Sequence, residues 1–252
     1  MKIICYRKID DIDIMFLDEY EYIVRNTAYC NFKSGQIKNP YDKSLYGVGY
    51  MGVGKFSSRN SEMKKPSDEY EVWTGMMGRC YHDKEKYPAY CGVTTVCEQW
   101  HCFQNFAKWF DDNKYEVDGR LHIDKDILYP NCKIYSPETC LLIPQRINML
   151  FLNKPNKRGL PNGISKSKSG KFAAVYCGKH IGTYSTLESA YAAYAEEKEK
   201  KIKQVADEYR NIIPKKAYEA LYAYKLDIKN DKNYGGIKCI KAEYLASMKI
   251  IF

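Results

Sequence analysis

The chain of 252 residues carries 45% hydrophobic and 28% charged side chains, a composition that excludes a wholly disordered protein. No apolar run reaches the roughly 18 residues that a membrane span needs, and Asp10, Asp11 and Asp13 interrupt any N-terminal signal peptide. The 10 cysteines then indicate reduced thiols, so we expect a cytoplasmic protein without a membrane partner.

The net charge of +9 is concentrated in the second half of the chain. It is +1 over residues 1–56, −2 over 57–152, +6 over 153–210 and +4 over the remainder. This segregation indicates a polyanion partner, and nucleic acid is favoured because no basic amphipathic helix with a bulky apolar face is evident. A solvated lysine-rich surface is the alternative.

Residues 1–56 are expected to be β-rich, with short strands at 12–16 and 20–24 separated by tight turns. A run of glycines from Gly47 to Gly54 matches two phosphate-binding motifs by letters. However, no helix follows the run, and Phe56 occupies the position of the hydroxyl that would bind Mg²⁺. We therefore expect no nucleotide cofactor.

The next segment alternates helices and strands. Apolar residues at helical spacing predict a helix that starts near Pro66 and a second one around residues 100–110, with a strand at 93–97 between them. A strand at 121–126, an irregular loop, a strand at 140–143 and a short helix at 144–150 follow. This order places Asp124 late on the first strand and Asn148 on the helix.

The C-terminal part begins after a polar linker. Strands at 172–176 and 181–184 precede a long amphipathic helix, which Ser185-Thr186-Leu187-Glu188 introduces as a capping box and Pro214 closes. Between Asn153 and Thr183 every charged residue is basic: Lys154, Lys157, Arg158, Lys166, Lys168, Lys171 and Lys179. Such a sheet on one helix is a compact device for placing cations in a DNA groove.

The expected fold class is α+β. It comprises a β-rich N-terminal part, a central ββα finger with flanking helices, and a C-terminal three-stranded sheet packed on a long helix. The expected divisions are a β-rich region at 1–56, a finger domain at 57–152, a linker at 153–158, a sheet-and-helix domain at 159–213 and a helical extension at 214–252.

The segment Gly170-Lys171-Phe172-Ala173-Ala174-Val175, with Ile181-Gly182-Thr183-Tyr184 after it, resembles the DNA-binding domain of the APETALA/ethylene-response-factor type over about 45 residues. Members of that family lay the sheet in the major groove. The resemblance implies base contacts from Lys166, Lys168, Tyr176, Lys179 and His180. We add Lys157, Arg158 and Lys171 to the expected DNA-binding set. A small basic β-hairpin and helix without this function is the alternative.

The central stretch resembles the His-metal finger (HNH) homing endonucleases of phages, which would place the protein in a bacterial host cytoplasm. The resemblance is strongest in Asp124-Lys125-Asp126, in Tyr135-Ser136-Pro137-Glu138-Thr139-Cys140 and in Gln145-Arg146-Ile147-Asn148. It implies Asp124 and Asn148 as ligands of Mg²⁺ or another divalent cation that stabilises charge during phosphodiester hydrolysis.

Two positions depart from the family pattern. The general-base histidine falls at Lys125, and the asparagine that orients this histidine falls at Thr139. An ammonium is a base only when its pKa drops, which burial and a metal favour. Strand alternation would place His122, Asp124 and Asp126 on one face, so His122 is the candidate base and Lys125 the phosphate contact.

A zinc site built from Cys80, His82, Cys91, Cys97 and Cys102 is not expected, because their spacings match no paired knuckle. The sequence thus predicts a metal-dependent, sequence-recognising DNA endonuclease that acts on double-stranded DNA, in an oligomeric state that the sequence leaves open. The alternative is a catalytically degenerate DNA-binding protein that regulates or inhibits a host system. A protein-binding structural component is a third class, which a salt titration of DNA affinity would separate from the other two.

Overall fold

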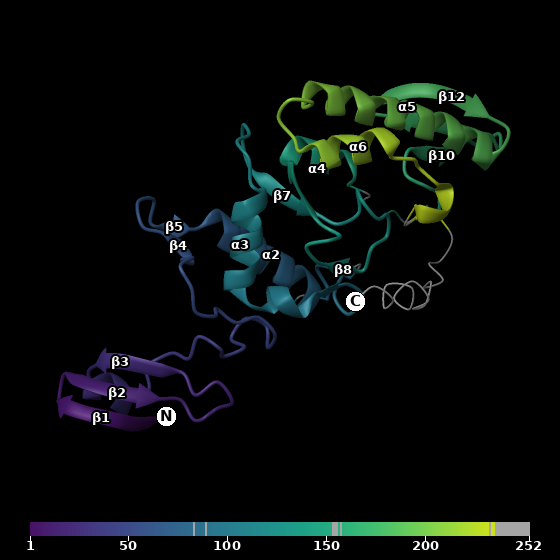
Figure 1. The fold of residues 1–252 in the computed structure, drawn as a ribbon. Helices are drawn as coiled ribbons and strands as arrows, with labels where there is room; N and C mark the ends of the chain where they lie inside the picture. Colours follow the sequence, from purple (N-terminus) through teal and green to yellow (C-terminus); the bar gives the residue numbers. More distant parts are fainter. Residues whose placement is uncertain (83, 89, 153–155, 157, 232, 235–252) are drawn as a thin grey trace, which may run out of the picture. The chain divides into compact units, whose positions relative to one another are not determined.

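The computed structural model describes residues 1–82, 84–88, 90–152, 156, 158–231 and 233–234. The expected α+β class is confirmed, because several small sheets are combined with helices (Figure 1). The chain groups into two compact units: unit 1 contains residues 1–114 and 132–140, and unit 2 contains residues 115–131 and the chain from Leu141 onward. The expected finger range 57–152 is therefore divided between the two units.

Unit 1 starts with an antiparallel sheet in the order β1-β2-β3, formed by β1 (Lys2–Lys8), β2 (Asp11–Met15) and β3 (Ile23–Thr27) and followed by α1 (Tyr29–Lys33). Ile12 and Ile14 of the central strand are completely buried. On the same strand, Asp13 accepts hydrogen bonds from the guanidinium of Arg7. The alternation of apolar and charged side chains along β2 thus gives the sheet one core face and one ion-paired face.

The remainder of unit 1 is mainly helical. Its elements are β4 (Arg59–Asn60), β5 (Lys65–Pro66), α2 (Asp68–Tyr81), β6 (Thr95–Val96), the 3₁₀ helix η1 (Glu98–His101), α3 (Phe103–Asn113) and β8 (Ile134–Tyr135). The indole of Trp73 on α2 donates a hydrogen bond of 2.7 Å to the carbonyl of Trp100. Trp73, Met76, Phe103 and Phe106 are buried between α2 and α3, as their helical spacing predicts.

Unit 2 contains nine elements among the described residues: β7 (Leu121–Asp124), β9 (Leu141–Pro144), α4 (Gln145–Leu150), β10 (Ile164–Lys166), β11 (Phe172–Tyr176), β12 (Lys179–Tyr184), α5 (Leu187–Glu208), α6 (Lys215–Ala223) and the 3₁₀ helix η2 (Ile228–Asn230). β7 pairs antiparallel with β9, and α4 begins directly after β9. β10, β11 and β12 form a second antiparallel sheet in that order.

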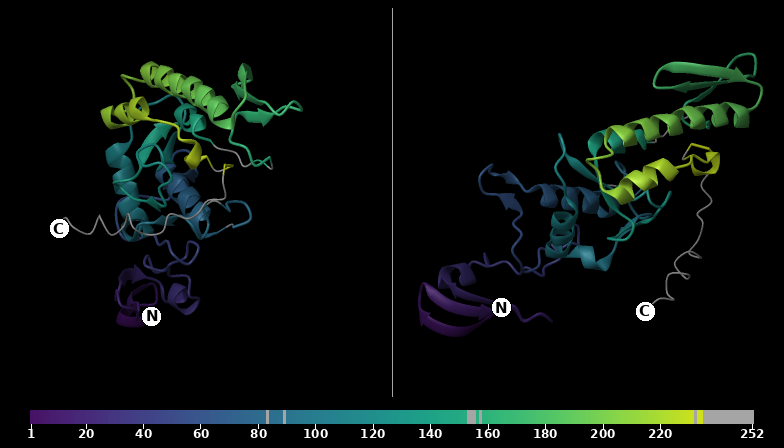
Figure 2. Two further views of the ribbon diagram at one scale, coloured as in Figure 1. Left: turned by 90° about the vertical axis from the view of Figure 1, so that its right-hand side faces the viewer. Right: turned by 45° about the horizontal axis from the view of Figure 1, so that its top comes forward.

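The helix α5 connects these parts of unit 2. Its 22 residues span about 33 Å. The N-terminal half packs on the sheet through Ala190, Tyr191, Tyr194 and Ala195, whereas Ile202, Val205 and Ala206 near the other end pack against β9, α4 and α6. The sheet and the ββα hairpin therefore lie at opposite ends of one helix (Figures 1 and 2).

The start of α5 differs by one residue from the expected capping box. Thr186 is the N-cap, and its hydroxyl oxygen accepts a hydrogen bond from the backbone N–H of Ser189 at 3.2 Å. Within the described residues, no helix combines the length and the apolar composition that crossing a bilayer requires.

We expect the variant Gly163→Ala to destabilise unit 2. Gly163 has φ +76°, and a Cβ there would overlap the Tyr194 ring and lie 2.8 Å from the Val175 carbonyl oxygen. The left-handed backbone costs about 1 kcal/mol for alanine, and the overlap adds about 1–3 kcal/mol. Urea denaturation measures the decrease in the free energy of unfolding.

Gly170→Ala is the matched control, because Gly170 also has a positive φ, of +83°, but an added Cβ would meet no atom within 4 Å. Equal decreases in the two variants would contradict close packing of Tyr194 against Gly163.

Candidate functional site

The ββα hairpin has the topology that the sequence predicts. Residues on β7 and β9 face one another in the pairs His122–Ile143 and Ile123–Leu142, and α4 then crosses back over the strands. Ile143 and Ile147 are completely buried and hold the helix against the core of unit 2. This packing fixes the position of the polar residues that β7 and α4 carry.

His122 and Asn148 are brought together by this packing. The side-chain nitrogen Nδ2 of Asn148 lies 3.3 Å from Nδ1 of His122, although 26 residues separate them in the sequence. The direction of this hydrogen bond depends on which amide atom faces the ring. With the Asn148 nitrogen toward it, Nδ1 of His122 is the acceptor, and with the oxygen toward it, Nδ1–H is the donor. With the oxygen facing Nδ1–H, Nε2 is the ring nitrogen of His122 that carries the lone pair and can accept a proton.

Asp124 is turned into the loop that follows β7. Its Oδ1 atom accepts hydrogen bonds from the backbone N–H groups of Asp126 at 2.9 Å and Ile127 at 2.8 Å. Burial raises the pKa of the Asp124 carboxyl to about 6, and the charge of Asp126 acts in the same direction, against these two hydrogen bonds. One carboxylate oxygen is thus already used to shape the turn.

The expected alternation of His122, Asp124 and Asp126 on one strand face is wrong for Asp126, because β7 ends at Asp124 and the next residues form a turn. Lys125 departs further from its expected role as a base or a phosphate contact. Its side chain is 5% exposed, and its Nζ atom forms an ion pair of 2.8 Å with Oδ1 of Asp126. A buried ammonium held by a carboxylate is not placed to contact a phosphate in solution.

Thr139 lies in unit 1, in a tight turn of the loop between the two strands. Its hydroxyl donates to the carbonyl of Ile134 at 2.9 Å and accepts from the N–H of Ser136 at 3.1 Å. Thr139 therefore stabilises a turn in unit 1, which explains why a small hydroxyl residue fits there.

The sheet of unit 2 has one open face and one face against α5. Tyr176 packs edge-on against Tyr194 of α5, with ring centroids 5.7 Å apart, and Lys179 lies 3.8 Å from Glu197 of the same helix. These two residues and Lys166, whose ammonium lies 5.6 Å from the centre of the Phe172 ring, belong to the helix side. The expected base contacts of Tyr176, Lys179 and Lys166 are therefore not available from the open face.

The open face carries small side chains. The register pairs Ala173 with Ser165 and Thr183, and Val175 with His180, and these five residues point away from α5. The Thr183 hydroxyl lies 3.4 Å from Nε2 of His180. Lys168 and Lys171 are exposed in and beside the β10–β11 turn.

Arg158 is exposed ahead of the sheet, and Lys157 lies outside the described residues. Ser165, Val175 and Thr183 on the open face were not among the residues expected to bind DNA. The signal that could have found them is the two-residue period of β11 and β12.

The hairpin offers few oxygen atoms that could hold a cation. In the described part of the chain, no three His, Cys, Asp or Glu side chains converge as a metal site, and this holds for the cysteines of unit 1 as well. Mg²⁺ commonly keeps several waters and takes only one or two protein oxygens. The second carboxylate oxygen of Asp124 and the amide oxygen of Asn148 are oxygens of that kind.

Comparison of the chain with protein-family models, with curated proteins and with solved structures finds no significant match. The roles of these residues therefore rest on their geometry and chemistry.

We expect Asp124 to make stability fall as pH rises through its pKa. The native carboxyl, with a pKa of about 6, holds its proton more tightly than the unfolded one at 3.8. The unfolded state therefore loses its proton first, and up to about 3 kcal/mol of stability disappears between pH 4 and pH 7.

Asp124→Asn keeps the acceptor oxygen but has no charge to titrate. The free energy of unfolding of wild type should therefore fall over this pH interval more than that of the variant. Chemical denaturation at the two pH values measures the difference, with the exposed Asp118→Asn as the control. Parallel pH profiles for wild type and Asp124→Asn would contradict the buried, proton-retaining carboxyl.

Proposed function

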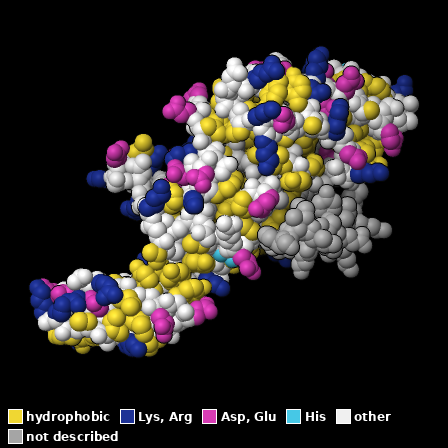
Figure 3. Space-filling view, in the orientation of Figure 1, with side chains coloured by type: hydrophobic (Ala, Val, Ile, Leu, Met, Phe, Trp, Pro, Cys, Tyr) yellow, Lys and Arg dark blue, Asp and Glu magenta, His cyan; other side chains and the backbone are white. Residues whose placement is uncertain are grey.

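We propose that this protein binds double-stranded DNA through the open face of the sheet β10-β11-β12. The observation that carries the proposal is the charge of this segment: residues 159–187 contain no acidic residue. His180 lies on the open face, and Lys168 and Lys171 are exposed at one end of the sheet. The face of the molecule seen in Figure 3 shows anionic side chains among the cationic ones. The sheet segment differs from α5 in this respect, because α5 carries Glu188, Glu196, Glu197 and Glu199.

The shape of the open face supports the same partner. Side chains at Ser165, Ala173 and Thr183 are small, so the backbone on this face can approach a groove wall closely. The major groove of DNA admits a β-ribbon, and its base edges offer donors and acceptors to His180 and Thr183. Lys168 and Lys171 stand at one end of the sheet, where they would meet phosphate oxygens.

The double variant Lys168→Ala/Lys171→Ala should weaken duplex binding uniformly across sequences. Removing one phosphate-binding lysine reduces the slope of log affinity against log salt by about 0.9, so we expect a slope shallower by about 2. Fluorescence anisotropy with a labelled duplex at several salt concentrations measures it.

The double variant Lys215→Ala/Lys216→Ala removes the same charge from exposed positions on α6 and is the matched control. A slope that changes equally in both pairs would show that only net charge matters and would contradict the sheet as the interface.

DNA hydrolysis at the ββα hairpin is a second candidate function, favoured by the contact between His122 and Asn148. With the Asn148 oxygen toward the ring, the Nε2 atom of His122 would take a proton from the attacking water. A divalent cation on Asp124 and Asn148 would stabilise the charge that develops on the phosphate oxygens. The amide oxygen of Asn148 has two lone pairs, so one could accept from Nδ1–H of His122 while the other faces the cation.

We expect the wild-type protein to nick supercoiled DNA that carries a cognate site in the presence of Mg²⁺, and His122→Ala to reduce the rate about 100-fold or more. The affinity of His122→Ala for duplex should be unchanged, since the hairpin and the sheet occupy opposite ends of α5. Gel electrophoresis of a plasmid library with randomised sites measures the cleavage.

If wild type and His122→Ala are equally inert over the whole library in Mg²⁺ and Mn²⁺, hydrolysis is excluded. Retained duplex affinity would then leave a DNA-binding regulator or inhibitor as the function.

A further inference from the structure

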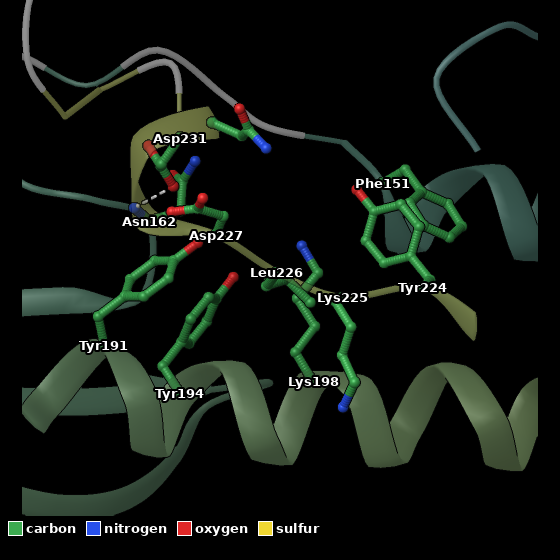
Figure 4. A pocket seen from close by; sticks show the side chains of 11 residues that line it. Phe151, Asn162, Tyr191, Tyr194, Lys198, Tyr224, Lys225, Leu226, Asp227 and Asp231 are labelled. Carbon is green, nitrogen blue, oxygen red and sulfur yellow. Dashed lines mark hydrogen bonds between the residues drawn. The ribbon is translucent and has the colours of Figure 1, made fainter. Parts of the chain in front are cut away.

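A cavity lies between α5 and the segment that connects α6 to η2, entirely within unit 2. Figure 4 shows Tyr191, Tyr194 and Lys198 rising from one face of α5 toward the segment that carries Asp227 and Asp231. The cavity and its open mouth enclose about 470 Å³. That volume includes open solvent at the mouth of the cavity.

Several hydrogen-bond donors of the cavity have no acceptor in the described part of the chain. The Nδ2 atom of Asn162 is buried without a hydrogen bond. The hydroxyls of Tyr191 and Tyr194 and the ammonium of Lys198 likewise make no hydrogen bond or ion pair with a described residue. Of these four donors the Asn162 nitrogen is the buried one, and a buried polar group is nearly always paired. The other three donors face the solvent-filled cavity.

The two phenols of the cavity keep their protons at neutral pH. Burial raises the pKa of the Tyr194 hydroxyl to about 12 and also raises that of Tyr191, so both phenols remain protonated at neutral pH. Burial lowers the pKa of Lys198, while the charge of Asp231 opposes this effect. A ligand that accepts hydrogen bonds would therefore relieve the unpaired donors.

Two carboxylates on the opposite wall restrict the kind of ligand. Asp231 accepts the backbone N–H groups of Asn162 at 3.0 Å and Asn233 at 2.9 Å, and Asp227 accepts that of Lys229 at 2.9 Å. Each carboxylate retains further lone pairs that can accept from a ligand. Their negative charge disfavours a phosphate or another small anion.

The remaining walls are aromatic. Phe151 and Tyr224 meet edge to face, with ring centroids 4.8 Å apart, at the end of the cavity beyond Lys198 (Figure 4). Together with Tyr191 and Tyr194 they provide flat apolar surface for a planar ring. The ligand that matches all three features is planar, neutral, accepts hydrogen bonds on one edge and donates an amine on the other.

We infer that this cavity binds a single amino-bearing nucleobase. Carbonyl or ring-nitrogen acceptors of the base would pair with Lys198, Tyr194 and Asn162, and its exocyclic amine with Asp231. Nucleobases bound singly are commonly held by such a combination of aromatic surface and polar edge contacts. The site goes beyond the proposed DNA binding and does not require it, because the base can belong to a free nucleoside or to an unpaired position in a DNA strand.

The test measures nucleoside binding to the full-length protein by calorimetry and ligand-observed NMR. Guanosine and cytidine, which carry both a carbonyl and an amine, should bind saturably and more tightly than thymidine, which lacks the amine. Lys198→Met and Tyr194→Phe should each weaken guanosine binding about tenfold, as expected when one hydrogen bond is removed. Lys200→Met, at an exposed position of α5 that does not line the cavity, should bind as wild type does.

A second experiment distinguishes the source of the base. It compares the affinity for a short single DNA strand with the affinity for the same strand that lacks the base at one position. Tighter binding of the intact strand than of guanosine indicates a strand base, and equal binding indicates a free nucleoside. The Lys168→Ala/Lys171→Ala variant should bind guanosine as wild type does, so failure of duplex binding is separable from failure of this site.

Two results would overturn the inference. One is the absence of saturable nucleoside binding at millimolar concentration, which would leave water as the only occupant. The other is displacement of the nucleoside by inorganic phosphate, which would identify an anion site.

Discussion

The burial of two separate apolar surfaces by α5 is the interaction on which unit 2 depends. Alanines and tyrosines of the N-terminal half cover one face of the sheet, and Ile202, Val205 and Ala206 cover the ββα hairpin and α6. Because one continuous helix carries both surfaces, it sets the spacing of the lysine-rich sheet from the pair of His122 and Asn148. The proposed DNA binding at the sheet and hydrolysis at the hairpin would need such a fixed separation.

The turn after β7 explains why the hairpin residues depart from their expected roles. The turn after β7 is closed by Asp124, whose oxygen accepts two backbone N–H groups, and Lys125 is buried in an ion pair with Asp126. Oδ1 of Asp124 and the ammonium of Lys125 are thus used to stabilise this turn, whereas His122 and Asn148 form a polar contact outside it.

The tyrosines of α5 show a second use of the helix. Tyr194 packs against Gly163 and Tyr176 of the sheet with its ring, while its hydroxyl reaches the cavity beside Asp231. An aromatic ring with a polar end can serve both a core and a binding site. Packing of the sheet and the chemistry of the cavity are therefore coupled through one side chain.

Local patterns determined much of this protein. Three features were readable from the sequence: the helical spacing of Trp73 and Met76, the strand–strand–helix order at 121–150, and the absence of acidic residues between Asn153 and Glu188. The outward face of β11 was not readable, because Phe172, Ala174 and Tyr176 alternate with Ala173 and Val175, so both faces are largely apolar. Only packing on α5, together with the irregular register between Ala174 and Val175, decided that Tyr176 and Lys179 face the helix. Burial of Lys125 and the meeting of His122 with Asn148 likewise arise from contacts between segments distant in sequence, which no local spacing encodes.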